Sequence, residues 1–385
     1  MLFLLIFTQP GRAGPLDTWT QGSPSPTQNS LRCVVYGGGQ FVAVGDGGAI
    51  VTSPHGTDWV LRLSGTQNNL FGIAYGEGRF VAVGDTGTVV TSDDAVNWFE
   101  EQSGTTNGLS AIAFGNGQFV SVGYDSAGNN GTILTSSDGV IWLSRRSGAT
   151  NSLEEIAFGN GQFVAAGGNG TVLASADGVN WTQHQSGTTS ELVQVACGGG
   201  ECVALGKNPG PAFLGKSIFT STDGVSWLSQ GVGNFVALGY ANDQFMAVSA
   251  GSIQGGDFYF SMSPDGVTWA DSHRLPLDSP FGGDVISALA YGNGHVVLVG
   301  PSVGYGGIIL ESGPIVNLAM RPKASTGLLL LSLEGPTGLD YTIQSSTDLI
   351  SWTDVTKITA SPSGKVILDG LPVDSGRTFY RAHAQ

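Results

Sequence analysis

A block of about 40 residues recurs along most of the chain, and this repeat constrains the fold more than any other feature. Each block holds an apolar strand, a glycine-rich turn, a second strand that reads like Phe119–Gly123, a third strand and a closing tryptophan. The closing tryptophans are Trp59, Trp98, Trp142, Trp181, Trp227 and Trp269, and a further one, Trp19, precedes the first block. About four short strands in each unit of about 40 residues are typical of a β-propeller blade.

The turns between the first and second strands fit such blades. Asn-Gly pairs occupy the centres of Phe114–Phe119, Phe158–Phe163 and Tyr291–Val296. Asn-Gly favours the type I′ turn, whose twist matches that of the flanking strands. These segments are therefore predicted to be β-hairpins.

The seventh block is incomplete and indicates how the ring closes. Gly307–Ser312 aligns with Gly131–Ser136, but no tryptophan follows it. The missing outer strand is found at the other end of the chain, around Trp19. Because unpaired ends would expose two sheet edges, we expect this strand to pair with Ile308–Glu311. The sequence thus predicts an all-β chain with a seven-bladed propeller over residues 15–315, closed by its N-terminal strand.

A short turn precedes each closing tryptophan, with the form Ser-x-Asp-Gly-x-x-Trp in four blocks. Two blocks carry variants, in which His55 replaces the aspartate or Ala95 the glycine. The motif resembles the Asp-box of sialidase-like (BNR-repeat) propellers, with one residue fewer between aspartate and glycine. The repeats are also similar to those of photosystem II assembly-factor propellers, which have no enzymatic chemistry. The resemblance covers roughly residues 16–315 and implies a propeller.

We interpret the motif as structural. An aspartate side chain accepts N–H groups of its own turn, the glycine supplies a positive φ, and the tryptophan packs between neighbouring blades. Single carboxylates on separate blades cannot converge on one ion, so we expect no metal site. No cofactor is expected. The aspartates given this role are Asp94, Asp138, Asp177, Asp223 and Asp265.

Residues 316–385 depart from the repeat and shift in composition toward Leu, Lys and Pro. Five segments alternate like strands, among them Asp340–Ser345 and Thr353–Ala360. The stretch resembles the small C-terminal β domains of large secreted bacterial proteins. We expect a β-sandwich-like domain, used for surface retention, glycan contact or capping of the propeller.

The first 14 residues contain the apolar run Met1–Phe7 and small residues at Gly11 and Ala13. The run is too short to span a membrane, and we interpret it as a truncated signal peptide without its positive n-region. A tail without structure is the alternative. The expected location is secreted, periplasmic or on the cell surface.

Charge argues against a polyanionic partner. The chain has a formal net charge of −15 and only 15 Lys and Arg residues. Nucleic-acid binding depends on clustered cations that displace counterions, so nucleic acid is not expected as a partner. A membrane span is not expected either, and we predict a monomer.

Two of the three cysteines, Cys197 and Cys202, stand where other hairpins have an aromatic pair such as Phe158 and Phe163. A two-residue turn places these positions directly opposite each other. We expect a cross-strand disulfide, and two buried thiols are the alternative. The remaining residue, Cys33, is expected to be buried and inert.

Loop length varies on one face, where the loops between second and third strands and the links between blades lie. The longer loops belong to blades 3, 5, 6 and 7, and binding sites usually lie on long loops over a rigid scaffold. Neutral insertions are the alternative. The candidate binding residues on these loops are Tyr124, Asp125, Lys207, Phe213, Lys216, Asp257, Tyr259 and Tyr305.

Near the axis, the innermost strands carry small residues except for Glu155 and Gln194, which we expect to line a polar channel mouth. The links repeat a Ser-Gly-Thr-x-Asn pattern, as in Ser64–Asn68. Their asparagines are expected to cap the loop backbone, and sugar binding is the alternative.

Three functions are compatible with these features. The favoured one is a non-catalytic, exported propeller that binds a protein or a glycan. A sialidase-like glycoside hydrolase would need an arginine cluster, a Tyr–Glu pair and a further acid, and the arginines lack that family's strand signature. A pair such as Asp125 and Glu155 is the remaining route to catalysis. The third possibility is a purely structural surface protein.

Overall fold

A computed structural model of the chain describes residues 16, 19–21, 26–125, 127, 130–207, 216–250, 257–277, 286–301, 307–313, 317–322, 329–334, 340–346, 353–359, 365–371 and 379–384. Apart from three short 3₁₀ turns, η1 (Asp46–Gly48), η2 (Asp85–Gly87) and η3 (Gly168–Gly170), the regular structure in these ranges is β-strand. The all-β prediction is therefore confirmed.

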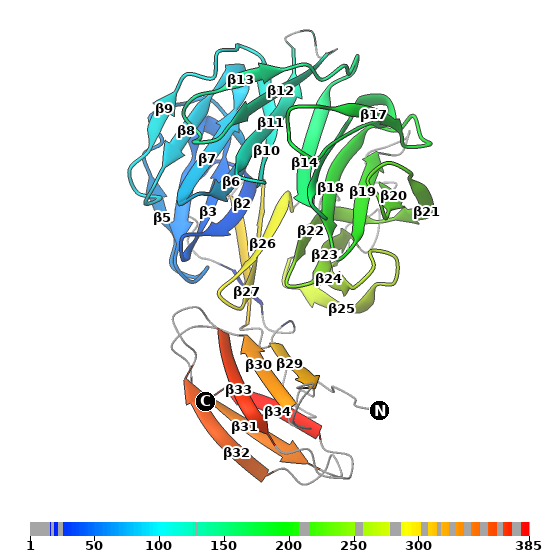
Figure 1. Cartoon of the computed structure of the whole chain (residues 1–385). Helices are drawn as coiled ribbons and strands as arrows, with labels where there is room; N and C mark the ends of the chain where they lie inside the picture. Colours follow the sequence, from blue (N-terminus) through cyan, green and yellow to red (C-terminus); the bar gives the residue numbers. More distant parts are fainter. Residues whose placement is uncertain are drawn as a thin grey trace. The chain divides into compact units, whose positions relative to one another are not determined.

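Seven four-stranded antiparallel sheets form the blades of a propeller around a common axis (Figure 1). The chain runs outward through each blade, so the first strand lies nearest the axis. Blades 1 to 3 contain β2 (Leu31–Gly37), β3 (Gln40–Gly45), β4 (Ile50–Ser53), β5 (Val60–Arg62); β6 (Leu70–Gly76), β7 (Arg79–Gly84), β8 (Val89–Ser92), β9 (Phe99–Glu101); and β10 (Gly108–Gly115), β11 (Gln118–Tyr124), β12 (Gly131–Ser136), β13 (Leu143–Arg145).

The remaining blades follow the same order, except that the last one is completed from the N-terminus. Blades 4 to 7 contain β14 (Leu153–Gly159), β15 (Gln162–Gly167), β16 (Thr171–Ser175), β17 (Thr182–Gln185); β18 (Leu192–Gly198), β19 (Glu201–Lys207), β20 (Lys216–Ser221), β21 (Leu228–Gly233); β22 (Phe235–Ala241), β23 (Gln244–Ala250), β24 (Phe258–Ser263), β25 (Ala270–Leu275); and β26 (Ala288–Gly292), β27 (His295–Gly300), β28 (Ile308–Ser312), β1 (Trp19–Gln21).

Closure of the ring by the N-terminal strand is confirmed. β1 lies beside β28 as the outer strand of blade 7. Trp19 is buried and donates from its indole Nε1 to the carbonyl of Leu16 at 2.7 Å. The Thr20 hydroxyl donates to a Glu311 carboxylate oxygen at 3.4 Å, which ties the strand to its neighbour. The two ends of the propeller thus share one sheet.

The hairpin turns adopt the geometry that the Asn-Gly pairs predict. Asn116 and Gly117 both have positive φ, at 47° and 71°. Asparagine tolerates this region and glycine adopts it without a steric penalty. The strands on either side pair Phe114 with Phe119, whose ring centroids lie 4.7 Å apart.

At several of these hairpins, neighbouring blades approach so closely that there is room only for a glycine. A Cβ on Gly76 would overlap the ring of Phe114 in the next blade, and a Cβ on Gly115 would overlap Phe158. Tyr75 likewise lies over Gly37 and Tyr240 over Gly198, whereas blade 6 has Ala241 at the equivalent position. The buried apolar clusters likewise combine residues from two adjacent blades, as Val42 and Trp98 do.

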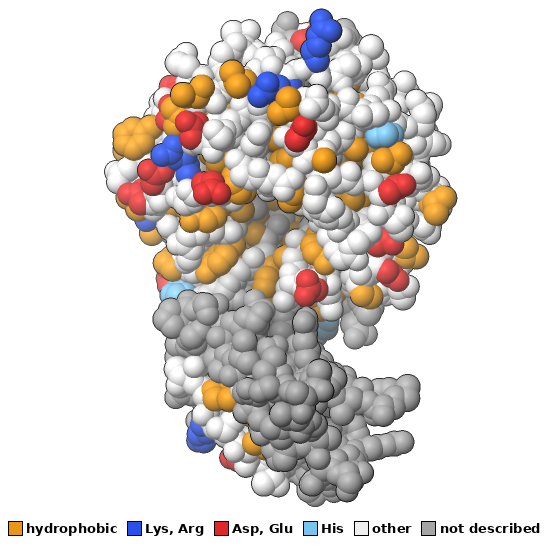
Figure 2. Space-filling view, in the orientation of Figure 1, with side chains coloured by type: hydrophobic (Ala, Val, Ile, Leu, Met, Phe, Trp, Pro, Cys, Tyr) orange, Lys and Arg blue, Asp and Glu red, His pale blue; other side chains and the backbone are white. Residues whose placement is uncertain are grey.

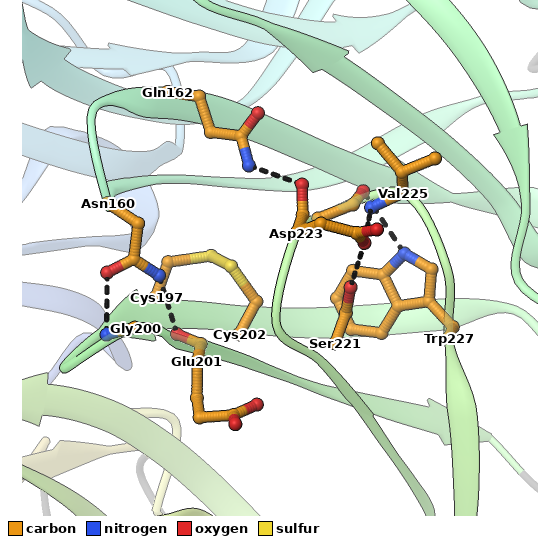
Figure 3. The surroundings of a disulfide bond; sticks show 11 residues. Asn160, Gln162, Cys197, Gly200, Glu201, Cys202, Ser221, Asp223, Val225 and Trp227 are labelled. Atoms are coloured by element: carbon orange, nitrogen blue, oxygen red, sulfur yellow. Dashed lines mark hydrogen bonds between the residues drawn. A yellow bond between two sulfur atoms is a disulfide. The ribbon is translucent and has the colours of Figure 1, made fainter.

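Cys197 and Cys202 are joined by a disulfide between β18 and β19 (Figure 3). The pair takes the place that aromatic residues occupy in the other hairpins. A Cβ on Gly159 would overlap the backbone carbonyl and the Cβ of Cys197, so blades 4 and 5 also approach closely here. The third cysteine, Cys33, is half-buried, and desolvation raises the pKa of its thiol to about 11.

The C-terminal residues form two three-stranded antiparallel sheets. Tyr341 and Ile343, which are alternate residues of one strand, are completely buried, as expected for the inner face of a layered domain. The first strand of the domain was not expected from the sequence. The sheets contain β29 (Asn317–Pro322), β30 (Leu329–Glu334) and β33 (Lys365–Leu371), and β32 (Thr353–Thr359), β31 (Asp340–Ser346) and β34 (Phe379–Ala384).

The signal peptide expected over residues 1–14 lies outside the described residues. Within the part of the chain that the structure describes, no helix has the length and apolar character needed to cross a membrane.

Replacing Trp19, the tryptophan of the strand that completes blade 7, tests its role in closing the ring. We expect Trp19→Ala to lower the free energy of unfolding by about 3–5 kcal/mol, because a buried indole is lost and the outer strand of blade 7 loses its anchor. Urea unfolding of the full chain measures this change. Phe99→Ala, at a ring that is 64% exposed, is the control and is expected to stay within about 0.5 kcal/mol of the parent. Equal effects of the two substitutions would contradict the closure role.

The disulfide closes a short loop and is expected to contribute about 2 kcal/mol by restricting the unfolded chain. Urea unfolding of Cys197→Ala/Cys202→Ala is expected to show a loss of that size. Cys197→Phe/Cys202→Phe restores the pair found in the other hairpins and should recover part of the loss through packing. An alanine variant as stable as the parent would show that the bridge has no stabilising role.

Candidate functional site

The propeller has two faces of different construction. The turn face carries the hairpin turns such as Asn116-Gly117 and the Ser-x-Asp-Gly turns. The loop face carries the loops between second and third strands, such as η2, and the links between blades, such as Ser103–Thr106. This assignment follows from the meander order of the four strands in each blade.

On the turn face, each Ser-x-Asp-Gly turn uses its own carboxylate. In blade 4, Asp177 Oδ1 accepts from the backbone N–H groups of Val179 and Asn180 at 2.9 and 2.8 Å. Asp177 Oδ1 also accepts from the hydroxyl of Ser175 at 3.0 Å. The indole of Trp181 donates to the Gly178 carbonyl at 2.8 Å. The same pattern of backbone donors surrounds Asp94, Asp138, Asp223 and Asp265.

These turns also connect neighbouring blades. The first side chain of the second strand in one blade donates to the aspartate carbonyl in the next. Gln162 Nε2 reaches the Asp223 carbonyl at 2.6 Å (Figure 3), and Arg79 Nη1 reaches that of Asp138 at 2.7 Å. The amide of Asn160 bonds to both the N–H of Gly200 and the carbonyl of Glu201. The polar groups of the turn face are thus occupied in holding the ring together.

The candidate residues of blade 5 lie at the ends of two strands. Lys207 and Lys216 face each other across β19 and β20. The Lys207 ammonium forms an ion pair with Glu191 at 3.0 Å, and Lys216 Nζ donates to the Val236 carbonyl of blade 6, also at 3.0 Å. Phe213, between them in the sequence, lies outside the described residues.

In blade 6, Asp257 and Tyr259 lie together with an arginine that the sequence did not indicate. The Arg274 guanidinium pairs with the Asp257 carboxylate at 2.7 Å, and the Tyr259 hydroxyl donates to the same carboxylate at 3.4 Å. The Arg274 guanidinium also lowers the pKa of the Asp257 carboxyl. In blade 7, Tyr305 lies outside the described residues, so the predicted wall of loops is described only in part.

In blade 3, Tyr124 ends β11 and Asp125 follows it. The Tyr124 ring lies against Gly108 at the start of β10. The Asp125 carboxylate accepts from the Asn130 amide of its own loop at 2.6 Å. Asp125 lies on this loop of blade 3, whereas Glu155 lies on the innermost strand of blade 4.

Glu155 and Gln194 lie on the innermost strands β14 and β18. Desolvation by the surrounding protein, together with the smaller effect of the neighbouring Glu154 charge, raises the pKa of the Glu155 carboxyl to about 8. Gln194 Nε2 donates to the carbonyl of Ser287 in blade 7 at 3.3 Å. This bond bypasses blade 6, which lies between blades 5 and 7 in the ring. The face turned toward the viewer in Figure 2 is hollowed at the centre of the ring.

A cleft of about 650 Å³ lies on the loop face of blade 2 and was missed by the sequence-based reasoning. The link residues differ from expectation here, because Asn68 donates to the hydroxyls of Thr86 and Thr88 rather than to the backbone. The repeated Ser-Gly-Thr-x-Asn pattern of the links was the sequence feature that could have indicated this cleft. Hydroxyl, amide and carboxylate groups line the cleft, from Asn68, Thr86, Thr88, Glu100, Glu101, Gln102, Ser103, Thr105 and Thr106.

Groups that could perform catalysis are dispersed in the described residues. No group of three or more His, Cys, Asp or Glu side chains within those ranges could hold a metal ion. Arg32, Arg79 and Arg274 each pair with an aspartate, at 2.7–2.8 Å. These arginines are separated in different blades.

The Ser-x-Asp-Gly turns make stability depend on pH. Backbone hydrogen bonds lower the pKa of Asp223 and of Asp265 to about 2, against about 3.9 in an unfolded chain. The stabilisation is present above pH 4 and is lost as the pH falls from about 4 to 2. We expect Asp223→Asn/Asp265→Asn to remain folded at pH 7, because the amide oxygen still accepts.

Between pH 4 and 2 this variant is expected to lose stability less steeply than the parent. Urea unfolding at several pH values measures the slope, with the exposed Asp58→Asn as the control. If the free energy of unfolding fell equally steeply with pH in the parent and the double variant, this account of the turns would be contradicted.

Comparisons with known proteins agree with the fold. No model of a protein family matches the chain, and neither does any curated protein. YCF48 from Cyanidioschyzon merolae is 16% identical, with a TM-score of 0.53, over 77% of this chain and 98% of that one. YCF48 bound to D1 peptide is 17% identical, with a TM-score of 0.54, over 77% and 96%.

The GH74 xyloglucanase from Xanthomonas campestris is 13% identical, with a TM-score of 0.54, over 82% of this chain and 59% of that one. At such identities the likeness extends to the fold alone. By fold, the chain is a seven-bladed β-propeller that resembles both YCF48 and the xyloglucanase.

Proposed function

We propose that the propeller is a non-catalytic, exported binding module that recognises a protein or a glycan through its loop face. The observation that carries this proposal is the different construction of the two faces, since only the loop face combines a polar cleft with loops of unequal length. The turn face uses its carboxylates and amides within turns and between blades. The loop face has a polar cleft of about 650 Å³ and the variable loops of blades 3, 5, 6 and 7.

A peptide is the ligand class that the comparisons favour. YCF48, a propeller of similar fold, binds a D1 peptide. A rigid ring with a variable loop face can present such a surface without any chemistry. A glycan is the second candidate, because hydroxyl and amide groups such as those of Asn68, Thr105 and Gln102 line the cleft of blade 2.

A sialidase-like or other glycoside hydrolase is the enzymatic alternative. The fold likeness to a xyloglucanase and the Asp-box-like turns favour it. However, a sialidase needs an arginine cluster free to grip a carboxylate, whereas Arg32, Arg79 and Arg274 each pair with an aspartate of this chain. A purely structural surface protein is the third candidate.

The test is a binding screen of the purified full chain against peptide and glycan arrays. We expect binding that Lys207→Ala/Tyr259→Ala or the cleft variant Glu100→Gln/Gln102→Ala weakens at least about tenfold, because both change the loop face. Glu201→Ala, on the turn face, is the matched control and should bind like the parent.

Three results would contradict the proposal. These are the absence of any ligand, binding that is lost only in the turn-face variant, and hydrolysis of xyloglucan or a sialoside by the parent. The first would favour a structural role and the last an enzyme.

A further inference from the structure

The innermost strand of blade 4 brings two consecutive acids to the loop-face end of the axis. A bulge between Leu153 and Glu155 inserts one extra residue into β14, so Glu154 and Glu155 both lie near the start of the strand. In the other blades, the position of Glu155 holds Cys33, Gly72, Ala111, Gln194, Ala237 and Ala288. Blade 4 therefore places the Glu155 carboxylate where five of the other blades have small side chains.

The Glu155 carboxylate has little compensation for its desolvation. It accepts one hydrogen bond in the described residues, from the backbone N–H of Ile156 at 3.1 Å. Burial favours the protonated form, and so does the Glu154 charge. Cys33 across the axis stays neutral, because the pKa of its thiol is about 11. An acid in such surroundings gains most from a cation brought beside it.

Two more polar groups at this place have no hydrogen-bond partner among the described residues. Gln194 uses its amide nitrogen on the Ser287 carbonyl, but its Oε1 is shielded from solvent and accepts nothing. The hydroxyl oxygen of Ser110, on the neighbouring inner strand β10, is buried in the same way. Leaving such buried groups without a partner is unfavourable. An incoming donor would remove that cost.

An aromatic ring and further negative charge lie at the rim. Tyr124 follows the second strand of blade 3, and both Asp85 and Glu154 are close enough to raise the pKa of its hydroxyl, together with desolvation as the larger cause. Asp85 is held in place by the Asn69 amide at 2.9 Å. Aromatic faces and carboxylates together favour a cationic group.

The cations of this chain near the rim are already engaged. Arg32 forms two hydrogen bonds of 2.8 Å with Asp46, and the Lys207 ammonium lies between the oxygens of Glu191 at 3.0 and 3.1 Å. Arg32 and Asp46 stand at the positions of Glu154 and Tyr124 in blade 1, and Lys207 stands at the position of Tyr124 in blade 5. The acids of blades 2 and 4, which are Asp85, Glu154 and Glu155, can therefore attract a cation of the ligand.

We propose that the axial mouth of the loop face binds the guanidinium or ammonium group of an arginine or lysine side chain from a protein ligand. Tyr124 would flank the entering side chain, Glu154 and Asp85 would attract it, and Glu155 and Gln194 Oε1 would accept its hydrogen bonds. This inference rests on the proposed binding function and names the chemistry of its ligand.

A metal ion fits this site less well. Calcium takes six to eight oxygen ligands, whereas the described residues offer no group of three or more acids, histidines or cysteines. A guanidinium instead has five N–H donors. These donors can bond to separate acceptors, as the groups on β10, β14 and β18 are.

The test is a titration of the full chain with N-acetyl-arginine methylamide, followed by NMR. Its citrulline analogue has nearly the same shape without the charge and serves as the neutral probe. We expect saturable binding of the arginine probe, at least about tenfold weaker binding of the citrulline probe, and a similar loss in Glu155→Gln. Glu201→Gln, on the turn face, is the matched control and should bind like the parent.

The Glu155→Gln protein is expected to fold, because at pH 7 most of the Glu155 carboxyl already carries a proton and glutamine has nearly the same shape. Binding of the arginine probe should strengthen from pH 6 to pH 9, since the cation displaces that proton, while Glu155→Gln should lack this rise. Arginine keeps its charge throughout this range.

Equal binding of the two probes, unchanged binding by Glu155→Gln, or no binding by the parent would overturn the inference. The array screen separates its failure from that of the proposed function. A ligand whose binding depends on the loop face but not on Glu155 would leave that function standing.

Discussion

The structure depends on the contact between one blade and the next, because no blade can bury its apolar faces alone. Three kinds of interaction repeat at this contact: an aromatic ring over a glycine, a tryptophan between sheets, and a side chain bonded to the carbonyl of a Ser-x-Asp-Gly turn. Such a ring is stable only when it closes. The seventh contact packs Val297 and Ile309 of blade 7 against Leu31 of blade 1, and the strand around Trp19 completes the sheet of blade 7.

The sequence predicted these features because each is local and repeated. Seven second strands, Asn-Gly turns and one displaced tryptophan are sufficient to infer seven blades and their closure. The strand Asn317–Pro322 escaped prediction because the C-terminal domain has no repeat against which to compare it. The cysteine pair could be placed because its hairpin has a known register in the other blades.

The candidate site was harder to predict, because it combines side chains that are distant in the sequence. Glu155 and Gln194 were recognised as exceptions in a column of small residues, but the unsatisfied Ser110 hydroxyl and the rim acid Asp85 follow only from three-dimensional structure. Lys207 looked available in the sequence, whereas Glu191, at the start of the same blade, pairs with it. Long-range pairing decides which charges remain for a ligand.

The central claim is that the turn face holds the blades together while the loop face binds the ligand. Hydrogen–deuterium exchange of the full chain tests this claim most directly. The exchange would be compared with and without a ligand recovered from the arrays. The account expects new protection on the loop face, in segments such as 85–88 and 153–156, with the turns at 94–97 and 177–180 unchanged. Protection confined to those turns would contradict it, because the groups assigned to holding the ring together would then be the ones that bind.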